Sequence, residues 1–206
     1  MKIAYLYYDF LNLYGESGNI KIISNILKYN KIKHEILYLS LDDELEFDKY
    51  DLVYIGSGTE DNLLISLKHL SKYKNDIKKY IEDNKFMLVT GNSVDMFGKK
   101  IDDNKALNIF EYEVTKGKRK MEEVYHNKIL GFINNNSYNN NYCDTDIIRH
   151  NNFYGTYILG PILVRNPYLV KQFLNDLTNK KLKYDLKLET KAYNEFIKNF
   201  KENTNE

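Results

Sequence analysis

The sequence predicts an α/β fold of three layers, in which a central, mostly parallel β-sheet lies between two layers of helices. In the first hundred residues, short apolar runs alternate four times with segments of helical periodicity. This alternation is typical of a parallel sheet that is covered on both faces. The chain has 206 residues, which is enough for one such domain with a full core.

Four strands are expected in the first half, at residues 3–8, 33–39, 52–55 and 86–89, because each is a short apolar run. Leucine and isoleucine spacing predicts helices over 18–29, over a segment after residue 60, and over 75–83. Ser17 is the expected N-cap of the first helix. Loops of small and polar residues, at 9–19, 56–60 and 90–93, follow three of the strands. Since ligands bind beyond the carboxyl ends of parallel strands, these loops are the expected site.

The second half has a different pattern. Residues 107–114, 124–132, 141–149 and 152–159 are expected to add antiparallel strands, and the asparagine-rich stretch 134–141 is expected to be a solvated loop. Helices are expected over 161–177, with Pro167 in an early turn, and over 184–200. Because no linker or internal repeat interrupts the chain, we expect one domain over 1–200, followed by a disordered tail at 201–206.

Composition and charge narrow the classes of function. The formal net charge of +1 argues against a nucleic-acid partner, although residues 116–120 form a short basic cluster. No apolar run approaches the roughly 18 residues of a membrane helix, so we expect no membrane span and a cytoplasmic location. The single cysteine, Cys143, excludes an internal disulfide, and the four scattered histidines have no metal-ligand spacing. We therefore expect neither a metal nor a cofactor. The abundance of lysine, asparagine and isoleucine indicates an AT-rich bacterial genome.

One stretch, residues 86–98 (F-M-L-V-T-G-N-S-V-D-M-F-G), organises the rest of the chain. An apolar run, a corner of small residues and a helical restart predict a buried strand that turns sharply into a helix. In many hydrolases and amidotransferases such an elbow presents a nucleophile on strained backbone. Here the residue at the apex is Gly91, which has no side chain.

Four motifs, taken together, carry a family resemblance over about residues 1–177. Residues 7–19 (Y-Y-D-F-L-N-L-Y-G-E-S-G-N) resemble a P-D-x-x-N-x-Y-G-D-x-G-N loop, and residues 51–58 (D-L-V-Y-I-G-S-G) resemble D-L-V-x-I-G-G-G. Residues 90–98 align with I-C-G-G-Y-Q-L-L-G, and residues 155–161 (G-T-Y-I-L-G-P) align with G-T-Y-L-H-G-P. A weaker match, residues 131–134 (G-F-I-N), is similar to G-F-E-N.

In this order and spacing, the motifs resemble the class I glutamine amidotransferase-like family of the cobyric acid synthase type. The greatest likeness is to the glutaminase-like subunit of lipid II isoglutaminyl synthase. The resemblance implies a flavodoxin-like three-layer α/β/α fold and a Mur-ligase-like synthetase subunit as partner. In the family, a cysteine attacks the amide of glutamine, a histidine moves the proton, and ammonia passes to the partner.

The departures from the family pattern fall on this chemistry. The resemblance places Gly91 at the cysteine position and Leu159 at the histidine position. Neither residue can attack a carbonyl or transfer a proton. Glycine tolerates the positive φ of an elbow, so Gly91 can preserve the turn without the thiol.

Other residues offer substitute chemistry. Thr90 and Ser93 flank the apex and are possible nucleophiles if a base lies within hydrogen-bond reach; alternatively, Thr90 ends the strand and Ser93 caps the next helix. Cys143 and His150 are expected to be structural or surface residues. Arg119, in the basic cluster, matches a family residue that meets a substrate carboxylate, although a solvated turn explains it equally well.

The loops and the resemblance define a set of expected ligand-binding residues: Tyr8, Asp9, Asn12, Gly15, Asn19, Gly56, Ser57, Gly58, Asn92, Ser93, Arg119 and Tyr157.

Three functions fit the sequence. The first is a non-catalytic binding or partner subunit of a Mur-ligase-like amidating enzyme in cell-wall precursor metabolism. The second is an active glutamine amidotransferase, of the cobyric acid synthase or lipid II isoglutaminyl synthase type, that uses a displaced nucleophile. The third is a sensor that holds glutamine or another small carboxylate or amide on helix N-termini.

Overall fold

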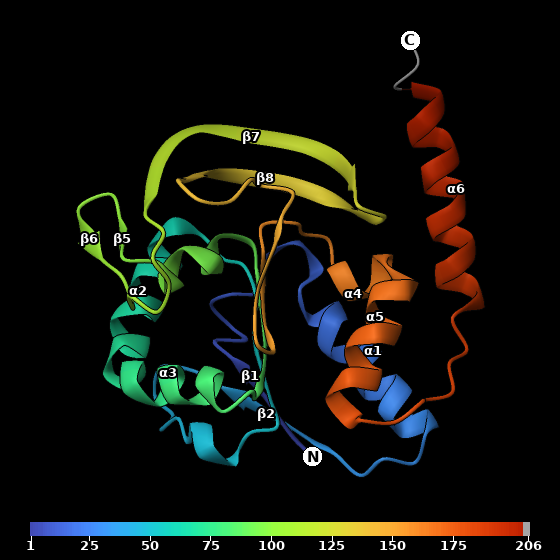
Figure 1. Ribbon diagram of the computed structural model, residues 1–206, viewed down its shortest axis with the longest axis horizontal. Coiled ribbons are helices and arrows are strands. Elements are labelled where there is room, and N and C mark those ends of the chain that lie inside the picture. The colour runs from blue at the N-terminus through green and yellow to red at the C-terminus, as the bar shows by residue number, and fades with distance from the viewer. Residues whose placement is uncertain (204–206) are drawn as a thin grey trace.

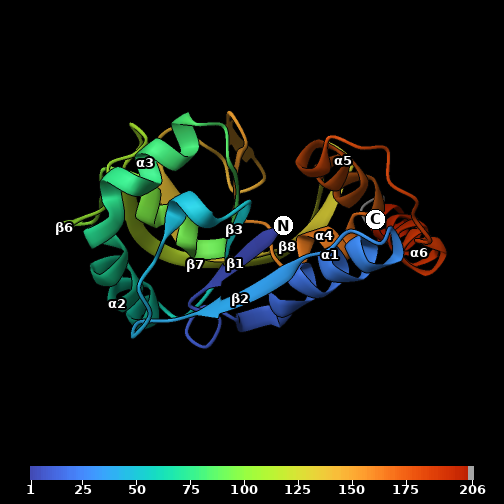
Figure 2. The same ribbon diagram turned by 90° about the horizontal axis from the view of Figure 1, so that it is seen from below.

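A six-stranded sheet lies between two layers of helices in the computed structural model, which describes residues 1–203 (Figure 1; Figure 2). The order of the strands is β2-β1-β3-β4-β10-β9, and every neighbouring pair is parallel except β9 with β10. Their bounds are β1 Lys2–Leu6, β2 Glu35–Leu39, β3 Leu52–Ile55, β4 Phe86–Thr90, β9 Ile147–His150 and β10 Phe153–Thr156. The predicted three-layer fold with a mostly parallel sheet is confirmed.

The helices divide between the two faces of the sheet. Figure 2 shows α2 (Glu60–Leu70) and α3 (Lys74–Glu82) on one side, and α1 (Ser17–Tyr29), α4 (Ile162–Arg165) and α5 (Pro167–Thr178) on the other. The last helix, α6 (Lys187–Asn203), projects along the outside of the α4 and α5 side (Figure 1). Pro167 is the first residue of α5, where its missing N–H removes no helical hydrogen bond.

A second, smaller sheet contains β5 (Lys100–Ile101), β6 (Asn104–Lys105), β7 (Val114–His126) and β8 (Ile129–Asn139), in the order β6-β5-β7-β8. The long β7–β8 hairpin arches across the top of the molecule in Figure 1. The remaining elements are short 3₁₀ helices: η1 (Leu13–Gly15), η2 (Phe47–Lys49), η3 (Ser71–Tyr73) and η4 (Gly91–Phe97).

The strand order fixes where a site can form. β1 lies between β2 and β3, so the chain leaves β1 toward one edge and returns to β3 on its other side. In sheets of this order, ligands bind beyond the carboxyl ends of the strands at this switch point. The loops after β1 and β3 meet there, because the Leu13 amide donates to the Ser57 carbonyl at 2.9 Å.

Most of the buried apolar side chains form one contiguous core. Strands β1, β3 and β4 are buried along almost their whole length, as is expected of central strands covered on both faces. The single domain over 1–200 stays a prediction. Residues 201–203 of the expected tail lie in the last turn of α6, and residues 204–206 lie outside the described residues.

Several predictions for the second half are wrong. Of the strand expected over 107–114, only Val114 lies in a strand, at the start of β7. Amides earlier in this stretch donate to the elbow segment: Leu107 N to Met96 O, and Ile109 N to Phe97 O. Residues 124–132 contain a hairpin turn rather than one strand. The expected antiparallel additions are present in the β9–β10 and β7–β8 pairs, although β10 is parallel to β4. The asparagine-rich stretch is not a solvated loop, because most of it forms β8, where Asn135 and Ser137 are buried.

Two local predictions also fail in the first half. Ser17 is the first residue of α1 rather than its N-cap. The helical restart after the elbow is the 3₁₀ helix η4, not an α-helix, and Ser93 lies inside it rather than at its cap. Among the described residues, no helix has both the length and the apolar character that a membrane span requires.

Candidate functional site

The elbow lies where β4 ends and η4 begins. Thr90 is the last strand residue, with extended backbone (φ −121°, ψ 151°), and Gly91 has a φ of +62°. Residues other than glycine are strained at such an angle. The apex therefore has the positive φ that the sequence predicts for an elbow with glycine at this position. Both residues are buried.

The space around the apex is already filled. A Cβ atom added to Gly91 would lie 2.5 Å from Ser57 Cβ and 2.8 Å from Leu159 Cδ2, and closer still to Ser57 Oγ. Carbon atoms in ordinary contact are about 3.5–4.0 Å apart, so a side chain at position 91 requires both neighbours to move. Ser57 is 3% exposed and Leu159 is 1% exposed. The three residues therefore meet at one closed point.

The Asn92 side chain ties the apex to the loop after β3. Its Oδ1 accepts from Ser57 Oγ at 3.1 Å and from Gly58 N at 3.2 Å, and its Nδ2 donates to Gly58 O at 2.8 Å. Next to it, Ser93 Oγ donates to Gly56 O at 2.5 Å. These polar groups, all expected to bind a ligand, bind one another in this structure.

The loop after β1 completes the floor of this region. The Leu13 amide reaches Ser57, as described above, and Asn12 Oδ1 accepts from the Ser17 amide at 2.9 Å. Gly15 has a φ of +80° at the end of η1. The structure thus brings the three expected loops, 9–19, 56–60 and 90–93, to one place.

A buried carboxyl group lies under the elbow, and the sequence analysis missed it. Glu16 is fully buried, and its Oε2 accepts from Thr90 Oγ1, from Tyr54 OH and, at 3.4 Å, from Asn19 Nδ2. Burial raises the pKa of Glu16 to about 7, against the opposing effect of these three hydrogen bonds. Glu16 Oε1 and the hydroxyl of Tyr5 are buried and have no hydrogen-bond partner.

A second buried carboxyl group, also missed, joins the elbow to the arching hairpin. Asp95 in η4 pairs with Lys116 Nζ at 2.7 Å and accepts from Ser137 Oγ at 2.6 Å and Tyr157 OH at 2.9 Å. Burial raises the pKa of Asp95, and the nearby Lys116 charge opposes this rise. Tyr157 is thus a buried structural partner of Asp95, not a residue open to a ligand.

Arg119 lies on the hairpin near the N-terminus of α2. Its guanidinium pairs with Glu60, the first residue of α2, and donates to Asn134 Oδ1 at 2.8 Å. Asn134 Nδ2 in turn donates to Tyr14 OH at 2.7 Å. Arg119, Glu60 and Tyr14 are each at least 40% exposed, so this group faces solvent. A carboxylate from outside would have to compete with Glu60 for the guanidinium.

Tyr8 and Asp9 are held on the β2 side of the loop. The Tyr8 ring packs edge-on against Tyr38 with centroids 5.4 Å apart, and Asp9 Oδ1 accepts from Ser40 Oγ at 2.7 Å. These contacts direct both side chains toward the edge of the sheet. Their contacts are with β2 and the loop that follows it.

The possible substitute nucleophiles have different surroundings. Ser93 donates to a backbone carbonyl, which is not a base. Thr90 Oγ1 does meet a base, the Glu16 carboxyl group, but Thr90 is 0% exposed. A nucleophile needs both a base and access to its substrate, and neither residue has both.

Cys143 and His150 do not belong to this group of residues. The Cys143 side chain is exposed rather than buried, and its amide donates to Asp146 Oδ2 at 2.8 Å. His150 is exposed at the end of β9, and its ring packs against Phe110 at 5.7 Å.

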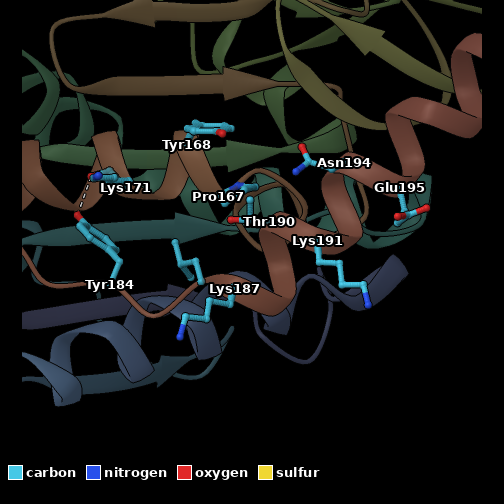
Figure 3. A pocket seen from close by; sticks show the side chains of 10 residues that line it. Pro167, Tyr168, Lys171, Tyr184, Lys187, Thr190, Lys191, Asn194 and Glu195 are labelled. Atoms are coloured by element: carbon cyan, nitrogen blue, oxygen red, sulfur yellow. Dashed lines mark hydrogen bonds between the residues drawn. The ribbon is translucent and has the colours of Figure 1, made fainter.

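A cavity of about 590 Å³ lies away from the elbow, between α5 and α6 (Figure 3). Three lysines line it, but the ammonium groups of Lys187 and Lys191 point away from Tyr168 (Figure 3). The Tyr184 hydroxyl donates to the backbone carbonyl of Lys171 at 2.7 Å. Since the charged groups do not converge, the elbow remains the better candidate site.

Comparisons with known proteins concern the sequence and the fold of the chain. No family model matches the chain. It is 28% identical over 200 residues to "Lipid II isoglutaminyl synthase (glutamine-hydrolyzing) subunit GatD" of Staphylococcus aureus (strain N315), covering 84% of this chain and 82% of the relative. It is 24% identical over 219 residues to the subunit of the same name from Streptococcus pneumoniae (strain ATCC BAA-255 / R6), covering 91% and 84%. A solved structure described as a glutamine amidotransferase has a TM-score of 0.54 at 13% identity, over 86% of this chain and 98% of that chain, and this likeness concerns the fold.

Proposed function

We propose that this chain, which is similar in sequence to two proteins named subunit GatD and in fold to a glutamine amidotransferase, is a non-catalytic member of the glutamine amidotransferase-like family. We infer that it acts in the bacterial cytoplasm as a binding or partner subunit of a Mur-ligase-like amidating enzyme in cell-wall precursor metabolism. The names of both relatives, each a subunit of a glutamine-hydrolysing synthase for lipid II, support this context.

One observation carries the proposal: the closed contact of Gly91, Ser57 and Leu159. The apex has the backbone angle of a nucleophile elbow, but Ser57 and Leu159 occupy the space that a nucleophile's side chain needs. Ser57 itself stands where the resemblance has a glycine. The chain therefore differs from the family pattern at two facing positions: Gly91 has no thiol, and Ser57 has a side chain where the pattern has none.

The chemistry of amide hydrolysis explains why this contact is decisive. A thiolate attacks the amide carbon, and a neighbouring histidine lowers the thiol pKa and protonates the leaving ammonia. Leu159, beside the apex, can do neither. Ser57 Oγ is bonded to an amide oxygen, which is too weak a base to activate it.

The remaining features suit a subunit that binds rather than reacts. Hydrogen bonds hold the three loops together, and the Asp95–Lys116 pair anchors the hairpin that carries Arg119. Tyr14 and Arg119 remain at the surface above these loops, where a small carboxylate or a partner protein can reach them.

The test is ammonia release from glutamine by the purified chain, alone and with a co-expressed Mur-ligase-like protein. We expect no release above the buffer rate in either case. A matched variant, Ser57→Gly with Gly91→Cys and Leu159→His, restores the residues of the family pattern and should release ammonia if the frame is intact. Ammonia release by the unaltered chain above the buffer rate would contradict the proposal.

The contact between Thr90 and Glu16 favours a second function, an active amidotransferase with a displaced nucleophile, because it pairs a hydroxyl with a base. Thr90→Val removes that hydroxyl and keeps the shape, and Ser93→Ala removes the other candidate. If the unaltered chain hydrolyses glutamine and one of these variants does not, this second function replaces the first. A ligand sensor, the third possibility, predicts a thermal shift with glutamine or glutamate in the absence of any partner.

A further inference from the structure

Glu16 lies where three segments of the chain meet. Its Oε2 accepts from side chains of β3 (Tyr54), β4 (Thr90) and α1 (Asn19). Asn19 also accepts from the Leu163 amide at 2.8 Å, at the start of α4. The carboxyl group is therefore the common acceptor of elements far apart in the sequence.

The two oxygens of this carboxyl group have unequal surroundings. Oε2 receives three donors, whereas Oε1 is buried without a partner. A proton on the carboxyl group therefore belongs on Oε1, because Oε2 is occupied by donors. The buried hydroxyl of Tyr5 on β1 also lacks a partner; burial raises the pKa of Tyr5, and the nearby Glu16 carboxyl group raises it further.

No compensating cation serves the ionised form. None of the ion pairs among residues 1–203 includes Glu16. The groups that face it are neutral: Tyr5, Tyr54, Thr90 and Asn19, with Tyr38 behind Tyr5. A buried, unpaired carboxylate is costly, and the cost is relieved when the group reaches water.

We propose that Glu16 is a proton-dependent latch, which holds the 9–19 loop and the start of α1 against the elbow when protonated and loosens them when it ionises. The group titrates near neutral pH when the latch is closed, and at an ordinary glutamate pKa when it is open. Closure is thus most favourable in mild acid and is weakened as the pH rises through 7. The latch does not depend on whether the chain is catalytic.

The size of the effect follows from the two pKa values. With a closed-state pKa of about 7 and an open-state pKa of 4.5, the opening equilibrium rises roughly 50- to 100-fold between pH 5 and pH 8. The change should be confined to the latch. The Leu13 amide bonds across the loops and the Asn19 amide lies in the first turn of α1, so both report opening. The Asp83 amide at the end of α3 is a control.

The experiment is an NMR titration of the unaltered chain with carbon-labelled glutamate, together with hydrogen exchange corrected for intrinsic rates. We expect one glutamate carboxyl signal to titrate near pH 7 and to be absent in Glu16→Gln. Protection of Leu13 and Asn19 should fall between pH 5 and pH 8 in the unaltered chain, stay constant in Glu16→Gln, and stay constant at Asp83 in both.

A second variant separates the latch from a general effect of charge. Glu46→Gln removes an exposed glutamate that pairs with Lys49, and it should leave the pH profile of loop protection unchanged. The latch is refuted if Glu16 titrates in the ordinary range of exposed glutamates. It is also refuted if Glu16→Gln shows the same pH-dependent loss of protection as the unaltered chain. The titration uses the unaltered protein, so it gives an answer even if Glu16→Gln fails to fold.

Discussion

Ser57 and Gly91 are fitted to each other: the Ser57 side chain occupies the volume into which any side chain at position 91 would extend. The backbone of Gly91, with a φ of +62°, favours glycine at this position. A hydrogen bond to Asn92 holds the Ser57 side chain in the space beside it. The effect of a substitution at one position on stability therefore depends on the residue at the other.

We predict a measurable coupling between these two positions. Gly91→Ala should lower the free energy of unfolding by about 2–4 kcal/mol, from backbone strain and overpacking together. In a Ser57→Gly background the same substitution should cost less, since the overpacking against Ser57 is gone. Urea denaturation of the two single variants and the double variant measures the coupling. Additive losses would show that the two side chains do not compete for one space.

Tyr54→Phe should be more destabilising at high pH than at low pH. The hydroxyl donates to Glu16 Oε2, and this hydrogen bond favours the ionised carboxyl group. Its removal raises the pKa of Glu16 further, so the stability lost as the pH rises through about 7 should grow by about 1 kcal/mol. Denaturation at pH 5 and pH 8.5 provides the comparison, with Tyr50→Phe as a control on the same fold. Equal losses at the two pH values would disprove this role.

Removal of one partner of the Asp95–Lys116 ion pair should lower stability more than removal of both partners. Lys116→Met leaves Asp95 buried without its cation, and we expect a loss of about 3–5 kcal/mol. Lys116→Met combined with Asp95→Asn removes both charges and should recover a large part of that loss. Thermal or urea denaturation of both variants decides the matter. A double variant less stable than Lys116→Met would show that the charge of Asp95 is not the cause.

Arg119 and Glu60 should have little effect on stability but a clear effect on ligand binding. The pair is exposed, so Glu60→Gln should change the unfolding free energy by less than about 1 kcal/mol. Because Glu60 competes with an incoming carboxylate for Arg119, Glu60→Gln should strengthen glutamate binding, and Arg119→Met should weaken it. Calorimetric titration with glutamate measures both. If Glu60→Gln weakens glutamate binding, or if Arg119→Met leaves it unchanged, Arg119 does not belong to the ligand-binding set.

The alternation of apolar runs and helical spacing was sufficient to predict the sheet and its helices, because buried parallel strands have strong local signals. The asparagine-rich part of β8 could not be predicted in the same way. Asparagine favours turns locally, but here β7 supplies backbone partners and the Asn135 side chain accepts from the Ser137 amide. Tertiary pairing overrides the local preference at this point.

The sequence predicts that the loops 9–19, 56–60 and 90–93 lie together, and the structure brings them together, but two buried carboxyl groups beneath them are not predicted. Glutamate and aspartate are rarely fully buried, so Glu16 and Asp95 gave no sign in the sequence that they anchor the elbow from inside. Tyr157 was placed among ligand-binding residues because it lies in a motif, whereas its hydroxyl binds Asp95 in the interior. Burial of a charged side chain depends on partners that are distant in sequence, and local patterns do not contain that information.

The closed contact at the apex also sets the order in which a cysteine and a histidine can be introduced into this chain. With Ser57 in place, Cys at position 91 is crowded, whereas Ser57→Gly first removes the nearest atoms. His at position 159 alone supplies a base with no thiol to activate. Reactivity at the apex therefore requires several coordinated substitutions rather than one.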